Sequence, residues 1–190
     1  EEENGCRVVV DTFGSNSAMY AKLSMGAAGY DLVTPTTYYA EMLQKQGRLR
    51  QLEHDKILNL KNLDPDYQEK LSHDPQAQYS VPYLVGTVGL AYHVKRVANP
   101  EQGWQLLTDD SLKGRTTLLT GERAVLGAAL LSQGKSLNSS NPEEIQAAAD
   151  RVIEWRKNVA TFDNELFKSG LANGEFWVCM AFSGDTLAVS

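Results

Sequence analysis

Three short segments contain side chains that could bind a ligand, and each lies where an apolar stretch gives way to a helix-like pattern. They are residues 34–38 (TPTTY), 120–123 (TGER) and 182–185 (FSGD). Their side chains include hydroxyls, aromatic rings and two carboxylates, Glu122 and Asp185. A carboxylate pairs with an ammonium group, and the face of an aromatic ring attracts the same cation. Together these groups are suited to binding an amine.

Both acids also have a second interpretation that needs no ligand. An acidic side chain in the first turn of a helix complements the helix dipole. The pattern alone therefore leaves two roles open for Glu122 and for Asp185, a ligand contact or a helix-start residue.

The surrounding sequence predicts different roles for the adjacent residues Tyr38 and Tyr39. Tyr39 is followed by Met42 and Leu43 at i+3 and i+4, so we expect it to pack along its helix. Tyr38 comes from the first turn, beside Thr36, and we expect its ring to form part of the ligand site.

Catalytic and metal-binding patterns do not stand out. His54, His73 and His93 are far apart and lack a second ligand at helical or hairpin spacing, so we expect no metal. The phosphate-loop, dinucleotide-binding and nucleophile-elbow motifs do not occur. Ser183 lies close to Asp185 in the sequence, but no histidine is placed to complete a triad with them. We expect neither an enzyme nor a cofactor.

The composition is that of an ordinary globular protein. Of 190 residues, 42% are hydrophobic and 22% are charged, and the net charge is −6. An acidic chain argues against nucleic acid as a partner.

The sequence contains no candidate transmembrane segment, because it has no run of 18 apolar residues that could span a membrane. The chain opens on Glu1, Glu2 and Glu3, so we expect the signal segment of the native protein to be absent from it.

The two cysteines, Cys6 and Cys179, are too few for a disulfide framework. Both stand in apolar stretches, and we expect both to be buried and unpaired.

The chain alternates between strand-like and helix-like patterns. We expect strands at residues 7–12, 30–34, 115–120, 159–162 and 176–182, and helices at 15–25, 37–46, 104–107, 122–133, 142–156, 164–172 and from about 183 onward. This alternation predicts parallel sheets covered by helices, with ligands bound at the carboxyl ends of the strands. Residues 79–94 form a long apolar stretch with two glycines, which predicts an extended crossover. We place a lobe boundary near Thr87, between domains at 1–87 and 88–190.

A family resemblance rests on six segments that follow one another in order. They are residues 15–23 (SNSAMYAKL), 30–39 (YDLVTPTTYY), 62–66 (NLDPD), 79–92 (YSVPYLVGTVGLAY), 112–125 (LKGRTTLLTGERAV) and 171–185 (LANGEFWVCMAFSGD). Together they resemble the spermidine/putrescine-binding proteins of polyamine ABC importers.

This resemblance implies an α/β fold of two lobes joined by hinge crossover strands, which close on a polyamine in the cleft between the lobes. It implies a receptor that does no chemistry and delivers the polyamine to ABC permease subunits. We expect a monomer in the periplasm, or one anchored by lipid on the outer face of the cytoplasmic membrane. Compared with the family, the chain is expected to lack both ends: the first strand and helix before 1–87, and the return crossover after 88–190. We therefore expect this chain alone to bind polyamine poorly.

The resemblance also implies roles for particular residues. Thr36 stands where the family has a small hydroxyl residue, and Tyr38 where it has an aromatic wall. Glu122 stands near an acid that pairs with an amine, Asp185 matches an acid of the putrescine binders, and Phe182 replaces a stacking tryptophan. The neighbouring Thr37 and Arg123 complete the expected ligand-binding set.

One departure leaves the ligand open. Ala124 stands where spermidine binders have a second carboxylate, immediately after Arg123. The preferred polyamine is therefore not defined, and a protein of the same fold for another amine or for an amino-acid derivative is the alternative.

Overall fold

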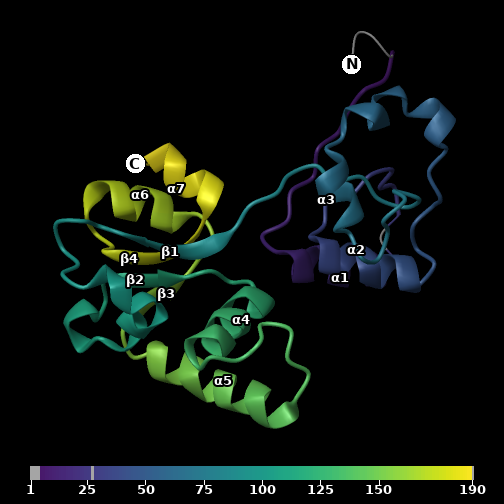
Figure 1. The fold of residues 1–190 in the computed structure, drawn as a ribbon. Coiled ribbons are helices and arrows are strands. Elements are labelled where there is room, and N and C mark those ends of the chain that lie inside the picture. Colours follow the sequence, from purple (N-terminus) through teal and green to yellow (C-terminus); the bar gives the residue numbers. More distant parts are fainter. Residues whose placement is uncertain (1–4, 27, 190) are drawn as a thin grey trace. The chain divides into compact units, whose positions relative to one another are not determined.

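The computed structural model describes residues 5–26 and 28–189. The chain divides into two compact units, Glu1–Val85 and Gly86–Ser190 (Figure 1). The acidic opening, Glu1 to Glu3, lies outside the described residues, and so does Ser190.

The second unit is built on a four-stranded sheet. Its strands are β1 (Val88–Tyr92), β2 (Thr116–Leu118), β3 (Val159–Phe162) and β4 (Val178–Phe182), in the order β1-β4-β2-β3. β2 runs parallel to both β3 and β4, whereas β1 runs antiparallel to β4. The carboxyl ends of β2, β3 and β4 therefore lie at one edge of the sheet, which we call the carboxyl edge. Val88 pairs with Phe182, so the start of β1 lies at this edge too.

Helices cover the sheet on both faces. In Figure 1, α6 (Leu166–Asn173) and α7 (Ser183–Val189) lie on one side, and α4 (Glu122–Ser132) and α5 (Pro142–Trp155) lie on the other. Two 3₁₀ helices, η3 (Pro100–Thr108) and η4 (Asp110–Leu112), lead into β2. The start of α5 follows from its sequence, because the side chain of Asn141 accepts a hydrogen bond from the backbone N–H of Glu143 at 2.9 Å, ahead of Pro142.

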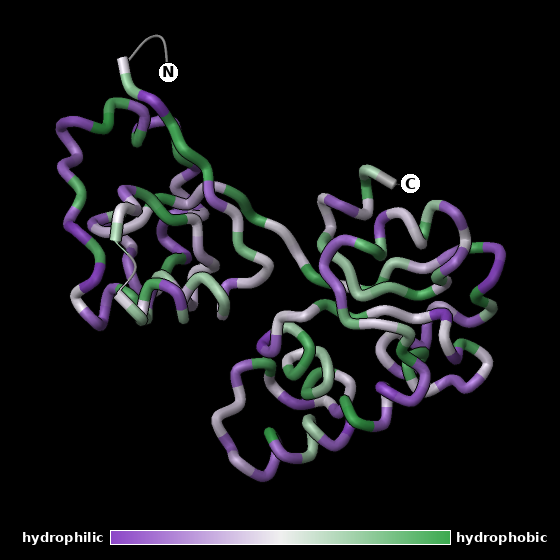
Figure 2. The backbone as a smooth tube through the Cα atoms, turned by 180° about the vertical axis from the view of Figure 1, so that it is seen from behind, coloured by the Kyte–Doolittle hydropathy of each residue, from purple (hydrophilic) through white to green (hydrophobic). Residues whose placement is uncertain are grey.

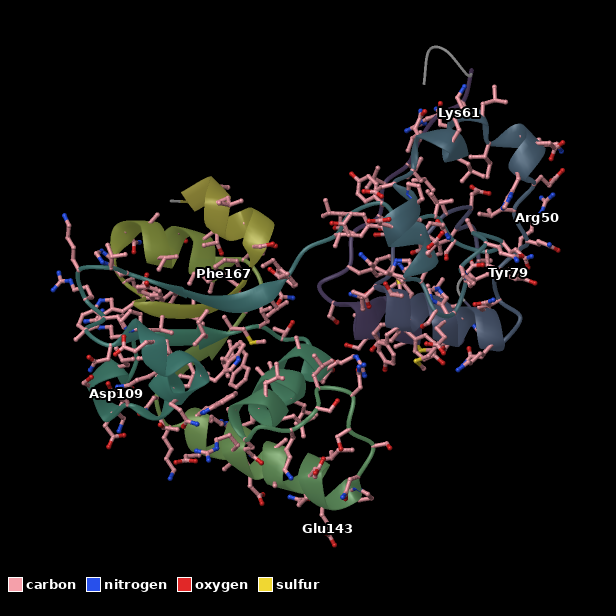
Figure 3. The ribbon with its side chains drawn as sticks, viewed as in Figure 1. Arg50, Lys61, Tyr79, Asp109, Glu143 and Phe167 are labelled. Carbon is pink, nitrogen blue, oxygen red and sulfur yellow. The ribbon has the colours of Figure 1, made fainter. Side chains whose placement is uncertain are left out.

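The core of this unit lies between the sheet and the helices. Trp155 from α5, Phe167 from α6, and Leu118, Val178 and Met180 from the strands are fully buried. Figure 3 labels Phe167, the second residue of α6. Apolar residues on both faces of a parallel sheet explain why these strands read as continuous hydrophobic runs.

The first unit consists of helices and irregular chain. Its helices are α1 (Asn16–Ser24), α2 (Thr37–Lys45) and α3 (Pro65–Glu69), with 3₁₀ turns η1 (His54–Lys56) and η2 (Leu58–Asn62). α1 begins as predicted, because the Ser15 hydroxyl accepts a hydrogen bond from the backbone N–H of Ala18 at 3.1 Å. α2 ends before Gly47, whose φ of 66° suits glycine, as predicted.

The two strands predicted in the first unit are wrong. Residues 7–12 and 30–34 form no ladder, and in the described part of this unit no strand occurs. Val8, Val9 and Val10 are 59%, 79% and 79% exposed, and this apolar segment follows the N-terminus as an extended tube in Figure 2. Strand propensity describes the fit of a side chain to a paired, half-buried surface, and these residues have no neighbouring strand. Among the described residues, the parallel strands expected from the alternation therefore occur only in the second unit, where the antiparallel β1 makes the sheet mixed.

Several smaller expectations also changed. Cys6 is exposed, contrary to expectation, and lies just before this exposed segment, whereas Cys179 in β4 is buried as predicted, and both are free thiols. Burial raises the pKa of Cys179 to about 11, and a hydrogen bond with Thr117 has a weaker effect that lowers it.

Two elements of the second unit differ from the expected ones. The strand in residues 79–94 is limited to Val88–Tyr92, and the helix expected at 104–107 belongs to the 3₁₀ helix η3.

The remaining elements of the second unit agree with the sequence within a few residues. α4, α5, β3 and the helix that begins at Ser183 are confirmed, and β2 and β4 are shorter than predicted. α6 begins at Leu166 rather than near 164, because Asp163 Oδ1 accepts hydrogen bonds from the backbone N–H groups of Glu165 and Leu166, each at 2.6 Å. Among the residues placed by the structure, no helix is long and apolar enough to cross a membrane.

Candidate ligand-binding site

The carboxyl edge of the second unit gathers four of the predicted site residues. Glu122 and Arg123 open α4 after the short loop 119–121 that follows β2, Phe182 is the last residue of β4, and Asp185 lies in the first turn of α7. Because β2 and β4 are paired neighbours in the sheet, both junctions lie beside each other at this edge. The sequence placed these four residues correctly at strand-to-helix junctions.

The end of β3 contributes two residues that the sequence analysis missed. The side chain of Asn164 accepts a hydrogen bond from the backbone N–H of Thr120 at 3.0 Å, and its Nδ2 donates to Thr120 Oγ1 at 2.8 Å. This pair of bonds joins the end of β3 to the loop that leads to Glu122. Asp163, one residue earlier, binds the first N–H groups of α6, and these bonds, that of Leu166 first, lower the pKa of its carboxyl group.

The signal for Asp163 and Asn164 was available in the sequence. The strand at 159–162 had been predicted, and two polar residues follow it directly, as at the other two junctions. The rule that parallel strands end at one edge applies to all three strands.

Phe182 and Asp185 occupy exposed positions at the end of β4. The Phe182 side chain is 42% exposed although it ends a buried strand. The Asp185 side chain is 37% exposed, and its Oδ1 lies 3.7 Å from the Nζ of Lys168 in α6. The ring of Phe182 and the carboxylate of Asp185 are thus both exposed at this junction, and each of these groups attracts an ammonium group.

The junction after β4 is also tied to the start of β1. The backbone N–H of Ser183 donates to the carbonyl of Thr87 at 2.9 Å, and the N–H of Thr87 donates to Ser183 Oγ at 3.2 Å. These contacts continue the antiparallel β1–β4 pairing past its last residue pair. They fix the turn from which Asp185 projects.

Glu122 and Arg123 differ in what surrounds them. Both are exposed, with Gly121 before them as the helix N-cap. Arg123 donates to Asn138 Oδ1 at 2.7 Å, so its guanidinium is bound to the loop between α4 and α5. Ala124 is half-buried and packs against the hydrophobic core, so its methyl group belongs to the interior.

The other three predicted residues open α2 in the first unit. Thr36 precedes the helix, and its backbone N–H donates to Asn16 Oδ1 at 2.8 Å, which links α2 to the start of α1. Thr36 and Thr37 are exposed, and the Tyr38 side chain is 37% exposed. This contact joins residues that are 20 positions apart in the sequence, and it was not predicted.

The two tyrosines of α2 differ in exposure. Tyr39 is half-buried, with its ring centroid 5.5 Å from that of Tyr20 and 4.5 Å from that of Tyr38. Its aromatic neighbours are therefore Tyr20 in α1 and Tyr38. Tyr38 remains accessible to a ligand at the start of α2.

The structure adds no evidence of a metal site. Within residues 5–26 and 28–189, no group of three or more His, Cys, Asp or Glu side chains could hold a metal ion. His54 has a structural contact, its Nε2 lying 2.7 Å from the carbonyl oxygen of Ala77.

Comparison of the structure with solved structures identifies the fold class. The structure superposes on that of a putative spermidine/putrescine ABC transporter protein from Listeria monocytogenes with a TM-score of 0.91 and 34% identity, covering 99% of this chain and 58% of that chain. It matches the TpPotD lipoprotein of Treponema pallidum with a TM-score of 0.89 and 32% identity, covering 100% of this chain and 60% of that one. The fold is thus the mixed α/β fold of periplasmic binding proteins.

The family follows from the sequence match. The model of the bacterial extracellular solute-binding protein family matches residues 1–190, so the chain belongs to this family. It is 34% identical to the spermidine/putrescine-binding periplasmic protein of Escherichia coli (strain K12), over 96% of this chain and 53% of that protein. It is also 34% identical to the putrescine/agmatine-binding protein of Pseudomonas aeruginosa, over 97% of this chain and 53% of that protein. These relatives are binding proteins rather than enzymes, and the chain spans about half of their length.

Proposed function

We propose that this protein captures a polyamine, spermidine or putrescine, and delivers it to an ABC importer. The observation that supports this most directly is the exposed pair of Phe182 and Asp185 at the carboxyl edge, with Glu122 on the neighbouring junction. Relatives that match nearly the whole chain are named for binding spermidine, putrescine or agmatine.

Each site residue has a role that its chemistry suits. Asp185 and Glu122 pair with ammonium groups, and the rings of Phe182 and Tyr38 attract the charged ends and cover the methylene chain. The hydroxyls of Thr36 and Thr37 accept hydrogen bonds from amines. Arg123 is positively charged, like a polyamine, so it is not expected to pair with the ligand. Its role is to hold the loop that follows α4 through its hydrogen bond to Asn138.

The domain organisation, partners and cellular location of the protein are also proposed from the family. Residues 1–87 and 88–190 are parts of the two lobes of a binding protein, which acts as a monomer with permease subunits as its partners. We place it in the periplasm or on a lipid anchor outside the cytoplasmic membrane, because its relatives are named as periplasmic proteins or as a lipoprotein. Nucleic acid is not a partner, in keeping with the net charge of −6.

A second candidate is a smaller or different amine. Ala124 packs against the core where spermidine binders have a second carboxylate, so the loop offers one acid fewer to the ligand. A hydrogen bond to a charged group contributes about 1.5–3 kcal/mol, so losing one disfavours a ligand with three ammonium groups relative to one with two.

A thermal-shift scan tests the proposal and separates the candidates. The full-length protein is heated with putrescine, spermidine, agmatine and a set of amino-acid derivatives, each at millimolar concentration. A ligand at 100 times its Kd stabilises the folded state by about 2.7 kcal/mol, which is easily measured. We expect a polyamine to raise Tm; if no polyamine does and an amino-acid derivative does, the polyamine proposal is wrong.

A further inference from the structure

Asp185 shares a lysine with a second carboxylate. Lys168 in α6 lies with its Nζ 2.6 Å from Glu165 Oε2 and 3.7 Å from Asp185 Oδ1. The Lys168 side chain is 34% exposed, the Glu165 side chain is 77% exposed, and α6 packs directly beside α7. The three charges form a row, acid–lysine–acid, that ends at the proposed ligand contact.

The two contacts of Lys168 are unequal. The contact with Glu165 has the length of a charge-assisted hydrogen bond, whereas 3.7 Å to Asp185 is an ion pair without a good hydrogen bond. The pKa of Lys168 is raised, first by Glu165 and also by Asp185, so the ammonium remains charged at neutral pH. Lys168 can therefore leave Asp185 and keep its stronger partner.

We propose that Lys168 is a built-in competitor for the Asp185 carboxylate, and that it sets polyamine affinity by occupying the position an incoming ammonium group must take. This inference rests on the proposed function. When the ligand binds, Lys168 is retained by Glu165, so that Asp185 is released without leaving an unpaired lysine.

The role is one of positioning and specificity, because Lys168 touches Asp185 rather than the ligand. A competitor of this kind weakens binding of cations and works less against a neutral or anionic ligand. It also keeps Asp185 paired when the site is empty.

The test measures putrescine binding to the full-length protein by calorimetry. Lys168→Met keeps the length of the side chain and removes its charge, and we expect putrescine to bind roughly two- to fivefold more tightly, the range of an exposed ion pair. Lys168→Arg keeps the charge and should bind as the wild type does. Glu165→Gln should bind more weakly, because Lys168 loses its other partner and pairs more fully with Asp185.

Two controls separate this contact from a general charge effect. Lys157→Met removes an exposed lysine that precedes β3, at the opposite edge of the sheet, and should leave putrescine affinity unchanged. In an Asp185→Asn background the gain from Lys168→Met should disappear. A gain that persists there, or one equal to that of Lys157→Met, overturns the proposal.

The outcomes also distinguish this inference from the proposed function. If the wild type binds putrescine and Asp185→Asn weakens it, but Lys168→Met has no effect, only the role of Lys168 is wrong. If the wild type binds neither putrescine nor spermidine, the proposed function and this inference are both wrong.

Discussion

The side chain of Asn164 binds both the backbone N–H and the hydroxyl of Thr120, at 3.0 and 2.8 Å, and so joins the ends of β3 and β2. The two residues are 44 positions apart in the sequence. Their contact joins the segment after β3 to the segment after β2, and it supports the loop that leads to Glu122.

Asn164→Ala should loosen that edge. Both bonds are lost at an exposed site, so we expect the free energy of unfolding to fall by about 1 kcal/mol, as measured by urea denaturation. Polyamine affinity should fall as well, because Glu122 is no longer held. Thr120→Ser keeps the hydroxyl acceptor and should behave as the wild type; equal loss in both variants would show that the contact is not responsible.

The buried Asp74 should anchor the segment that leads out of the first unit. Asp74 is 3% exposed, and its carboxylate accepts hydrogen bonds from the backbone N–H groups of Gln78, Tyr79 and Ser80 and from the Ser80 hydroxyl, at 2.8–2.9 Å. Asp74→Ala leaves several of these donors unpaired, and we expect the unit to lose about 2 kcal/mol or more. Hydrogen exchange at residues 78–80 would show the loss locally, with the exposed Asp55→Ala as control.

The contribution of Asp74 should also depend on pH. Burial raises its pKa, but the hydrogen bonds from Tyr79, Gln78 and Ser80 together outweigh burial, and the net shift is downward. A group whose pKa is lower in the folded state stabilises the protein fully above its unfolded pKa of about 3.9, and this stability is lost as pH falls through the folded value. The difference in unfolding free energy between the wild type and Asp74→Asn should be constant from pH 7 to 5 and shrink below about pH 4. A difference that grows on acidification would contradict this assignment.

Phe182→Trp should strengthen polyamine binding. Tryptophan has the best ring for a cation, and the gain at an exposed site is about 0.5–1 kcal/mol, or two- to fivefold in Kd. Phe182→Leu keeps the apolar volume but removes the ring, and it should bind more weakly than the wild type. If the tryptophan and leucine variants bind alike in calorimetry, the ring at this position does not contact the ligand.

Gly170 in α6 should not tolerate a side chain. A Cβ there would lie 2.2 and 2.5 Å from Cδ2 and Cε2 of Phe176, which is 6% exposed. Alanine normally favours a helix over glycine, but this overpacking should cost about 1–3 kcal/mol and give a net loss of stability. Gly127→Ala in α4 is the matched helical control in a thermal melt, because its added Cβ would make only an ordinary contact with Leu137 Cβ at 3.7 Å. A stabilised Gly170→Ala would contradict the packing described for α6.

The elements that the sequence predicted well are those whose signals are local. Asn141 and Pro142 define the start of α5, Ser15 caps α1, and the glycines at 47 and 134 follow the ends of α2 and α4. The strands at 7–12 and 30–34 were wrong because a strand depends on a partner elsewhere in the chain, which β-branched composition does not reveal.

The site shows the same division between local and non-local information. Glu122, Phe182 and Asp185 could be placed at strand-to-helix junctions from periodicity alone, and the polar residues after the strand at 159–162 marked the position of Asn164. The hydrogen bonds of Asn164 with Thr120 and the ion pair of Lys168 with Asp185 join residues on different elements, so local spacing does not identify these partners. Sequence reasoning therefore predicted candidate ligand contacts and missed the residues that position them.

Asp185 is proposed to bind an ammonium group of a polyamine. Calorimetric titration of spermidine and putrescine into the full-length wild type, Asp185→Ala, and the control Asp150→Ala on the surface of α5 measures this contact. We expect the wild type and the control to bind one polyamine alike, and Asp185→Ala to bind it more than about tenfold more weakly while remaining folded, as expected when a charge-assisted pair is lost. Unchanged affinity in Asp185→Ala would show that this residue only begins a helix, and would contradict the account.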